Sequence, residues 1–113
     1  MTHQFTEMAF ARQLVKRDRK ELALVKIGEH EALHTKAVGV QIAAKAADEA
    51  LAAIDVVLER CDIKNNGNGA APTFIDMNCG CPIYEVAKKR GLGAALLRSP
   101  RKLEKLLTRI VEV

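Results

Sequence analysis

Two cysteines, Cys79 and Cys81, stand one residue apart in the stretch MNCGCP at residues 77–82, although the chain has only three cysteines in all. An amide, Asn78, precedes the pair, and a proline follows it. Thiol and amide side chains at a turn can transfer a proton, hold a metal ion or bind a ligand. We therefore predict a catalytic or binding role for this stretch, and not only a role in packing.

The spacing of the two cysteines allows three roles. Metal ligation usually needs a second pair of ligands; His30 and His34 are spaced as one, but they lie far from the thiols in sequence. A redox pair normally has two intervening residues, and here there is one. The third role is a single active thiol, Cys81 or Cys79, beside a bystander. We predict no metal site.

A second polar candidate is Gln41, which lies inside the apolar run KAVGVQIAA at residues 36–44. A buried amide is costly without hydrogen-bond partners, so Gln41 must bind a neighbouring backbone group or a ligand. Gln41 and Asn78 both fall near the carboxyl ends of expected strands. Functional residues of α/β folds gather at that end, which favours a binding role.

The elements that must position these residues alternate between helix and strand. Short β-branched runs predict buried parallel strands, and amphipathic spacing with capping residues predicts the helices. Only two strands are clear, so we expect consecutive βα units around two parallel strands, as part of a TIM (β/α)8 barrel or a doubly wound sheet. The expected strands are 36–44 and 73–78, and the expected helices are 6–15, 22–27, 48–60, 84–90 and 100–110.

The composition indicates which class of binding partner suits the chain. The 113 residues carry a net charge of +4, and eight of the 18 basic residues fall between positions 88 and 109. Such a cluster suits a polyanion such as RNA, although a solvated helix face is the common alternative. No apolar run is long enough to span a membrane, and no secretory signal is visible. Reduced thiols and this N-terminus predict a protein of the cytoplasm or nucleus.

Several ordered motifs together resemble one family. FIDMNCGCPIYEVAKKRGLGAALLRSP, at residues 74–100, resembles the signature of the tRNA-dihydrouridine synthases: Asp-x-Asn, Gly-Cys-Pro, a basic pair, then Gly-x-Gly and a leucine pair. Upstream, TEMAFARQLVKRD and VGVQIA are similar to the family's Glu-Met helix start and Gly-Val-Gln strand. The form Asn-Cys-Gly-Cys-Pro-Ile is most like the eukaryotic branch that acts on position 47 of tRNA.

The resemblance implies an FMN-bound TIM barrel that reduces a uracil ring of tRNA, with NADPH as the reductant of the flavin. It implies that Cys81 is the acid that protonates the ring and that Cys79 is a bystander. Gln41 and Asn78 would hold the flavin, and Asn78 the target base as well. It also implies RNA contacts, which would come from Lys88, Lys89 and Arg98.

The length departs from the family, because a TIM barrel takes about 250 residues. We therefore expect residues 1–113 to be part of a catalytic domain, without its first strand, later strands or C-terminal RNA-binding domain. The isolated chain is expected to be inactive and to hold FMN weakly, and its open sheet edges predict instability or association. The glycine-rich loop at 62–72 is longer than the family's usual link.

Two alternatives remain at this point. Another FMN barrel, such as a dihydroorotate dehydrogenase relative, also places a cysteine after a strand-end asparagine, but the tract KKRGLGAALLR argues against it. The other alternative is a non-catalytic RNA-binding remnant that keeps the basic face and has lost the cofactor site. Retention of flavin distinguishes the remnant from the enzyme.

Overall fold

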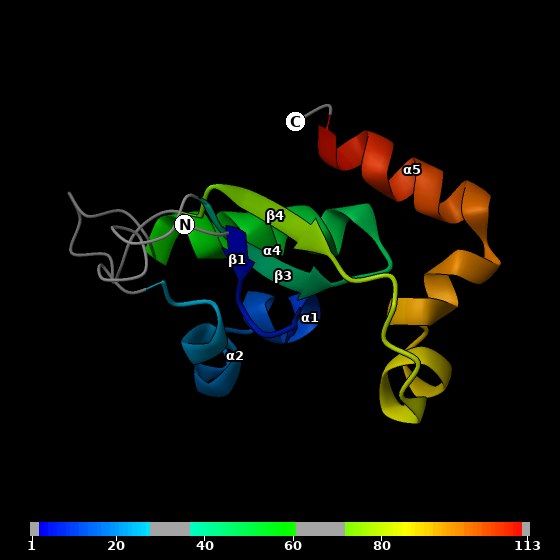
Figure 1. Ribbon diagram of the computed structural model, residues 1–113, viewed down its shortest axis with the longest axis horizontal. Helices are drawn as coiled ribbons and strands as arrows, with labels where there is room; N and C mark the ends of the chain where they lie inside the picture. Colours follow the sequence, from blue (N-terminus) through cyan, green and yellow to red (C-terminus); the bar gives the residue numbers. More distant parts are fainter. Residues whose placement is uncertain (1–2, 28–36, 61–71, 112–113) are drawn as a thin grey trace.

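A computed structural model describes residues 3–27, 37–60 and 72–111, and its centre is a parallel sheet (Figure 1). Strand β3 (Ala37–Ala43) lies in the middle, and β4 (Phe74–Met77) pairs with one side of it. The other side of β3 pairs first with β1 (His3–Phe5) and then with β2 (Ala9–Phe10). All three pairings are parallel, as the alternation of helices and strands predicts.

The N-terminal edge strand is a correction to the sequence-based expectation. A helix was predicted from Thr6, whereas the helix α1 is Ala11–Val15 and Thr6 continues the strand pairing. The Thr6 backbone N–H donates to the Gly39 carbonyl at 3.0 Å, and the Thr6 hydroxyl accepts from the Gln41 backbone N–H at 3.2 Å. These strand pieces are too short to show a period of two, so their conformation depends on pairing with β3.

The two longest helices lie close to their expected ranges, whereas the helix expected at 22–27 is α2 (Arg19–Leu24) in the structure. Asp18 caps α2 by accepting from the backbone amides of Lys20 and Glu21. The Glu21 carboxylate accepts from the Phe10 backbone amide at 2.8 Å and so ties α2 to β2. The remaining helical segments are α4 (Ala47–Arg60), a π-helical turn (Glu85–Lys89), a 3₁₀ helix (Gly93–Arg98) and α5 (Pro100–Val111).

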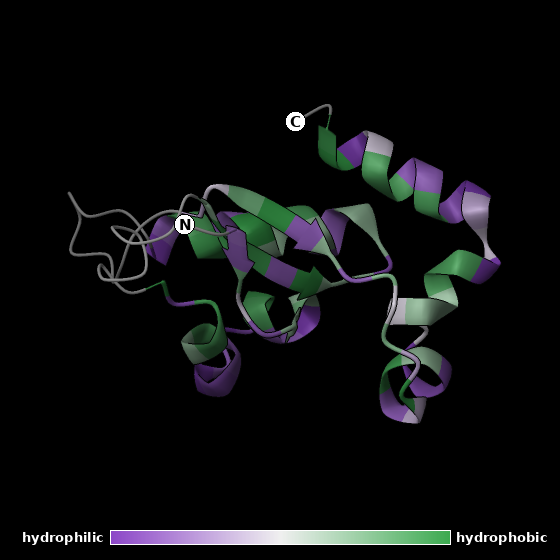
Figure 2. Cartoon of the chain, in the orientation of Figure 1, coloured by the Kyte–Doolittle hydropathy of each residue, from purple (hydrophilic) through white to green (hydrophobic). Residues whose placement is uncertain are grey.

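The main core lies between one face of the sheet and helices α1 and α4. Alternate residues of β3, namely Val38, Val40 and Ile42, are buried there against Leu14 of α1 and Val57 of α4. Helix α5 is amphipathic (Figure 2) and buries Leu106, whereas Leu107 is 40% exposed. Because strand side chains alternate, residues 39, 41 and 43 point to the opposite face.

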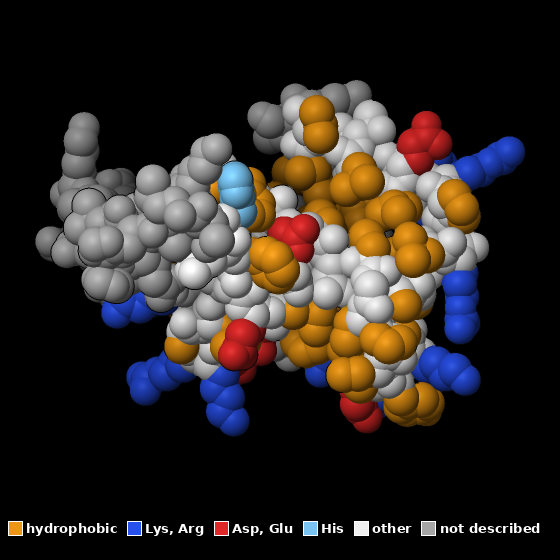
Figure 3. Space-filling model, in the orientation of Figure 1, with side chains coloured by type: hydrophobic (Ala, Val, Ile, Leu, Met, Phe, Trp, Pro, Cys, Tyr) orange, Lys and Arg blue, Asp and Glu red, His pale blue; other side chains and the backbone are white. Residues whose placement is uncertain are grey.

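The described helices leave most of that opposite face uncovered (Figure 1); its end at Ala43 packs with Val86 of the π-helical turn and Leu92. Hydrophobic side chains gather on the side of the molecule shown in Figure 3, and most of the basic side chains project around its periphery. Phe5, on this face of β1, is 60% exposed. A parallel sheet is normally covered on both faces, so this face and the free sides of β1 and β4 suit contact with further barrel strands. Within the described residues, no helix is long and apolar enough to cross a membrane.

Candidate functional site

A hydrogen-bonded row of polar side chains crosses the open face of the sheet. Gln41 of β3 lies opposite Asp76 of β4 in the strand register, and its side-chain nitrogen donates to the Asp76 carboxylate at 2.7 Å. The Asn78 side-chain nitrogen in turn donates to the Gln41 side-chain oxygen at 3.0 Å. From the sequence, Asp76 is recognisable only as part of the Asp-x-Asn motif, without a role of its own. In the structure the carboxylate fixes the orientation of the Gln41 amide, because it can only accept.

The same row controls the turn that carries the cysteines. The Asn78 backbone N–H continues the pairing of β4 by donating to the Ile42 carbonyl at 2.9 Å. The Asn78 side-chain oxygen accepts from the backbone N–H groups of Gly80 at 3.3 Å and Cys81 at 3.1 Å. An asparagine that binds the backbone beyond it in this way stabilises a turn. Asn78 therefore connects the position of Cys81 to Gln41 and Asp76.

The Gln41 and Asn78 side chains have hydrogen-bonding groups that no bond of the row uses. A side-chain amide carries two N–H donors, and both Gln41 and Asn78 use one of them within the row. Gln41 also keeps one lone pair of its oxygen. Both side chains are partly exposed at the carboxyl edge of the sheet, so they can bind a planar ligand with donor and acceptor edges. The structure brings these two amides into contact, and their role toward the flavin stays a prediction.

Cys81 is held from its other side by the segment after the π-helical turn. The Ala94 amide donates to the Cys81 carbonyl at 2.9 Å. Gly93 has φ +58°, and a Cβ at this position would lie 2.7 Å from the Cys81 carbonyl oxygen. Only glycine accepts that backbone conformation together with so close an approach. The half-buried Cys81 also packs against an apolar cluster that includes Val86 and Leu92.

Cys79 has a different environment from Cys81. It packs against the main core instead of the Val86 cluster, so the two thiols lie in separate environments. Burial, and secondly the nearby Asp76 carboxylate, raises the pKa of the Cys79 thiol above its usual value. Gly80, between the two cysteines, is outside the left-handed region, and the Asn78 side chain stabilises the turn.

The three predicted RNA-contact residues are exposed, but they do not form one group. Lys89 pairs with Glu85 at 3.4 Å and lines a hollow of about 410 Å³ together with Arg90 and Lys45. Lys88 and Arg98 do not line this hollow. Lys45, in the loop after β3, was missed because nothing in its local sequence distinguishes it from other exposed lysines.

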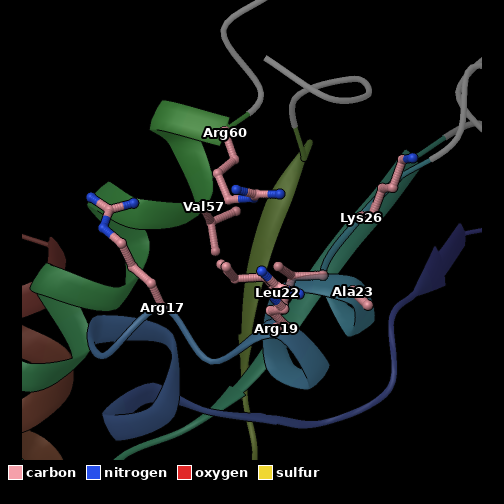
Figure 4. A pocket seen from close by; sticks show the side chains of 8 residues that line it. Arg17, Arg19, Leu22, Ala23, Lys26, Val57 and Arg60 are labelled. Carbon is pink, nitrogen blue, oxygen red and sulfur yellow. The ribbon is translucent and has the colours of Figure 1, made fainter.

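A second basic hollow, of about 490 Å³, lies between α2 and the end of α4. Leu22 and Val57 lie between the side chains of Arg17, Lys26 and Arg60 (Figure 4). Because α4 begins at the carboxyl edge of the sheet and runs back along it, this hollow is at the end opposite the cysteine turn. His30, His34, Cys61 and most of the 62–72 loop lie outside the described residues.

Comparisons with known proteins match the sequence of this chain to one family. The family model described as Dihydrouridine synthase (Dus) matches residues 2–113. A tRNA-dihydrouridine(47) synthase [NAD(P)(+)] of Cryptococcus neoformans var. neoformans serotype D is 37% identical over 102 residues, covering 90% of this chain and 13% of the relative. Proteins of the same name from Coccidioides immitis and Schizosaccharomyces pombe are 32% and 31% identical, covering 91% and 88% of this chain and 15% of each relative.

This chain therefore spans only about 13–15% of the length of these relatives. The family has the TIM-barrel fold, and the described parallel strands with their covering helices are a part of such a barrel, which confirms the expected fold class. The match extends over nearly the whole chain, from the strand pieces before Gln41 to the last helix. The chain belongs to the dihydrouridine synthase family.

Proposed function

We propose that this chain is the part of an FMN-dependent tRNA-dihydrouridine synthase that carries the proton-donating cysteine. The enzyme would reduce the C5–C6 bond of a uridine in tRNA. The observation that supports this best is the hydrogen-bonded row from Asp76 through Gln41 and Asn78 to the Cys81 amide. It brings two amides and a thiol turn together at the catalytic edge of a barrel sheet. The names of the relatives supply the substrate and NAD(P) as the redox partner.

The residues present fit a flavin. Gln41 and Asn78 each keep an N–H donor, Gln41 keeps an acceptor position, and both lie on the face that the described helices leave mostly uncovered. A flavin ring has an edge of alternating donors and acceptors, which such amides can bind. When bound and reduced by NADPH, FMN supplies the hydride for C6 of the uracil. Residues 1–113 would form one portion of the flavin barrel, with further strands completing it.

Cys81 is proposed as the general acid of this reaction. Its Sγ–H bond breaks, the proton goes to C5 of the uracil, and the thiolate is reprotonated from solvent. Together with the hydride at C6, this proton adds two hydrogens across the C5–C6 bond. The Asn78 side chain and the Ala94 amide hold the backbone of Cys81 on both sides, which would keep Sγ directed at the ring.

The enzyme must bind the tRNA while the target base is extruded from its stacked position between neighbouring bases. Base extrusion costs a few kcal/mol, and contacts to the flanking phosphates can offset it. Lys88, Lys89 and Arg98 are exposed and remain the proposed contacts. The dihydroorotate dehydrogenase alternative has no support in the family match, whereas the RNA-binding remnant is distinguished by the experiment below.

Flavin retention by an exchange chimera tests the proposal. In this chimera, the matched residues of this chain replace the corresponding segment of the Cryptococcus neoformans relative. We expect the purified chimera to keep stoichiometric FMN after desalting, because Gln41 and Asn78 take part in its site. Asn78→Ala should lower FMN retention, since it removes a donor and releases the cysteine turn. The measurement is the visible flavin spectrum relative to protein concentration.

The matched control is Gln4→Ala, which removes an exposed amide of β1 that lies outside the hydrogen-bonded row. It should leave FMN retention unchanged. A chimera that folds, as judged by circular dichroism, but keeps no flavin would contradict the proposal and favour the remnant. The 113-residue chain alone is expected to lose FMN on desalting.

A further inference from the structure

Lys45 occupies a position that the proposed reaction has not used. It is exposed and lies in the loop between β3 and α4, four residues beyond Gln41 at the carboxyl edge of the sheet. Its side chain extends across Gly91, since a Cβ placed there would lie 3.7 Å from Lys45 Cδ and 3.8 Å from Nζ. Topology therefore brings a lysine of the β3–α4 loop against the loop that follows the π-helical turn.

Three hollows share Lys45 as a lining residue, with volumes of about 410, 320 and 260 Å³. We call them together the Lys45 groove. On one side of Lys45 the groove is lined by α1 and the end of the π-helical turn, and on the other side by α5. Its cationic side chains, besides Lys45, include Arg12, Lys16, Arg90, Lys102 and Lys105.

The charge of the groove is only weakly compensated by acids. Glu49 is the one acidic residue among its lining residues. Two further lining cations have carboxylate partners: Lys89 pairs with Glu85 at 3.4 Å, and Arg109 with Asp48 at 3.2 Å. These four side chains are more than half exposed, and such pairs contribute little. Among the described residues, Lys45 and Lys102 form no ion pair, so their charges remain available to a ligand.

The groove is joined to the cysteine turn by apolar packing. Phe10 and Leu92 line it, and both belong to the cluster against which Cys81 packs. The Arg90 guanidinium lies 4.3 Å from the centre of the Phe10 ring, a cation–π contact that fixes this wall. A polyanion in the groove would thus lie beside the segment that positions Cys81.

We propose that the Lys45 groove binds the sugar–phosphate backbone of the RNA strand that flanks the target uridine. This inference rests on the proposed function, which makes RNA the substrate. The three hollows meet at one shared lysine, and lysine and arginine from several elements line them. Such a surface suits successive phosphates better than a single small anion. Lys45 and Lys102 are its central contacts, in addition to the predicted Lys89.

The test is the binding of a fluorescent unmodified tRNA transcript to the exchange chimera, measured by anisotropy between roughly 50 and 200 mM salt. We expect Lys45→Gln to weaken binding several-fold and to reduce the slope of log affinity against log salt by about 1, as loss of one phosphate contact predicts. Lys45→Gln with Lys102→Gln should roughly double the change in slope. All of these side chains are exposed, so the fold should be unaffected.

The matched control is Lys26→Gln, in the basic hollow at the opposite end of the sheet. It makes the same change in net charge and should leave affinity and salt slope nearly unchanged. Equal effects of Lys45→Gln and Lys26→Gln, or no binding of tRNA at low salt, would overturn the proposal. Neither of these results bears on flavin retention by the chimera, so failure of the groove is distinguishable from failure of the proposed function.

Discussion

Cys81→Ser in the exchange chimera is expected to lower the rate of dihydrouridine formation by about 10²–10⁴-fold, the usual contribution of a positioned general acid. Serine keeps the size of the side chain and the backbone contacts of the turn. Its hydroxyl is a far weaker acid than a thiol, so transfer of a proton to C5 becomes slow. The rate is measured with excess NADPH on tRNA that lacks dihydrouridine, and FMN content should remain that of the unsubstituted chimera.

Cys79→Ser is the matched control for this prediction. Burial and the Asp76 carboxylate raise the pKa of the Cys79 thiol, so it is protonated at neutral pH and is the one rival donor within the turn. Cys79 packs against the main core instead of the Val86 cluster, so we expect the substitution of its thiol to change the rate little. A large loss with Cys79→Ser and a small one with Cys81→Ser would reverse the assignment.

Gly93→Ala is expected to destabilise the 113-residue chain by about 1–3 kcal/mol. A non-glycine residue at φ +58° costs about 1–2 kcal/mol. In addition, the new Cβ would lie 2.7 Å from the Cys81 carbonyl oxygen and 3.0 Å from Val86 Cγ1, so the backbone must move. Urea denaturation followed by circular dichroism measures the change in the free energy of unfolding.

Gly80→Ala serves as the comparison, since it adds the same methyl group one residue from Cys81. Gly80 is exposed, has no atom within 4 Å of an added Cβ, and is not in the left-handed region. Its substitution should change the free energy of unfolding by less than about 0.5 kcal/mol. Equal effects of the two substitutions would mean that Gly93 does not hold the turn as the structure indicates.

The central strand and the type of fold could be predicted because their signals are local. The β-branched run around Val40 predicts a buried parallel strand, and the amphipathic spacing before Arg60 predicts α4, which begins at Ala47 instead of Asp48. The edge strand could not be predicted in this way. Its pieces have three and two residues, and they are strands only because β3 offers unpaired backbone groups.

The candidate site was predicted in part. Gln41 and Asn78 were found because amides at strand ends are unusual, and the structure brings them into contact; their roles toward flavin stay predictions. Asp76 was passed over because a carboxylate inside a strand is not informative until its cross-strand partner is known. Lys45 was missed for a related reason: its contact with Gly91 joins two loops that are distant in sequence.

The most direct test of the central claim is whether the unsubstituted exchange chimera forms dihydrouridine in tRNA. Purified chimera, NADPH and an unmodified tRNA transcript are incubated together, and dihydrouridine is quantified by mass spectrometry of the digested RNA. We expect dihydrouridine at the position that the parent relative modifies, in an amount that depends on Cys81. A chimera that folds and keeps FMN but forms no dihydrouridine would contradict the assignment of this segment to the catalytic machinery.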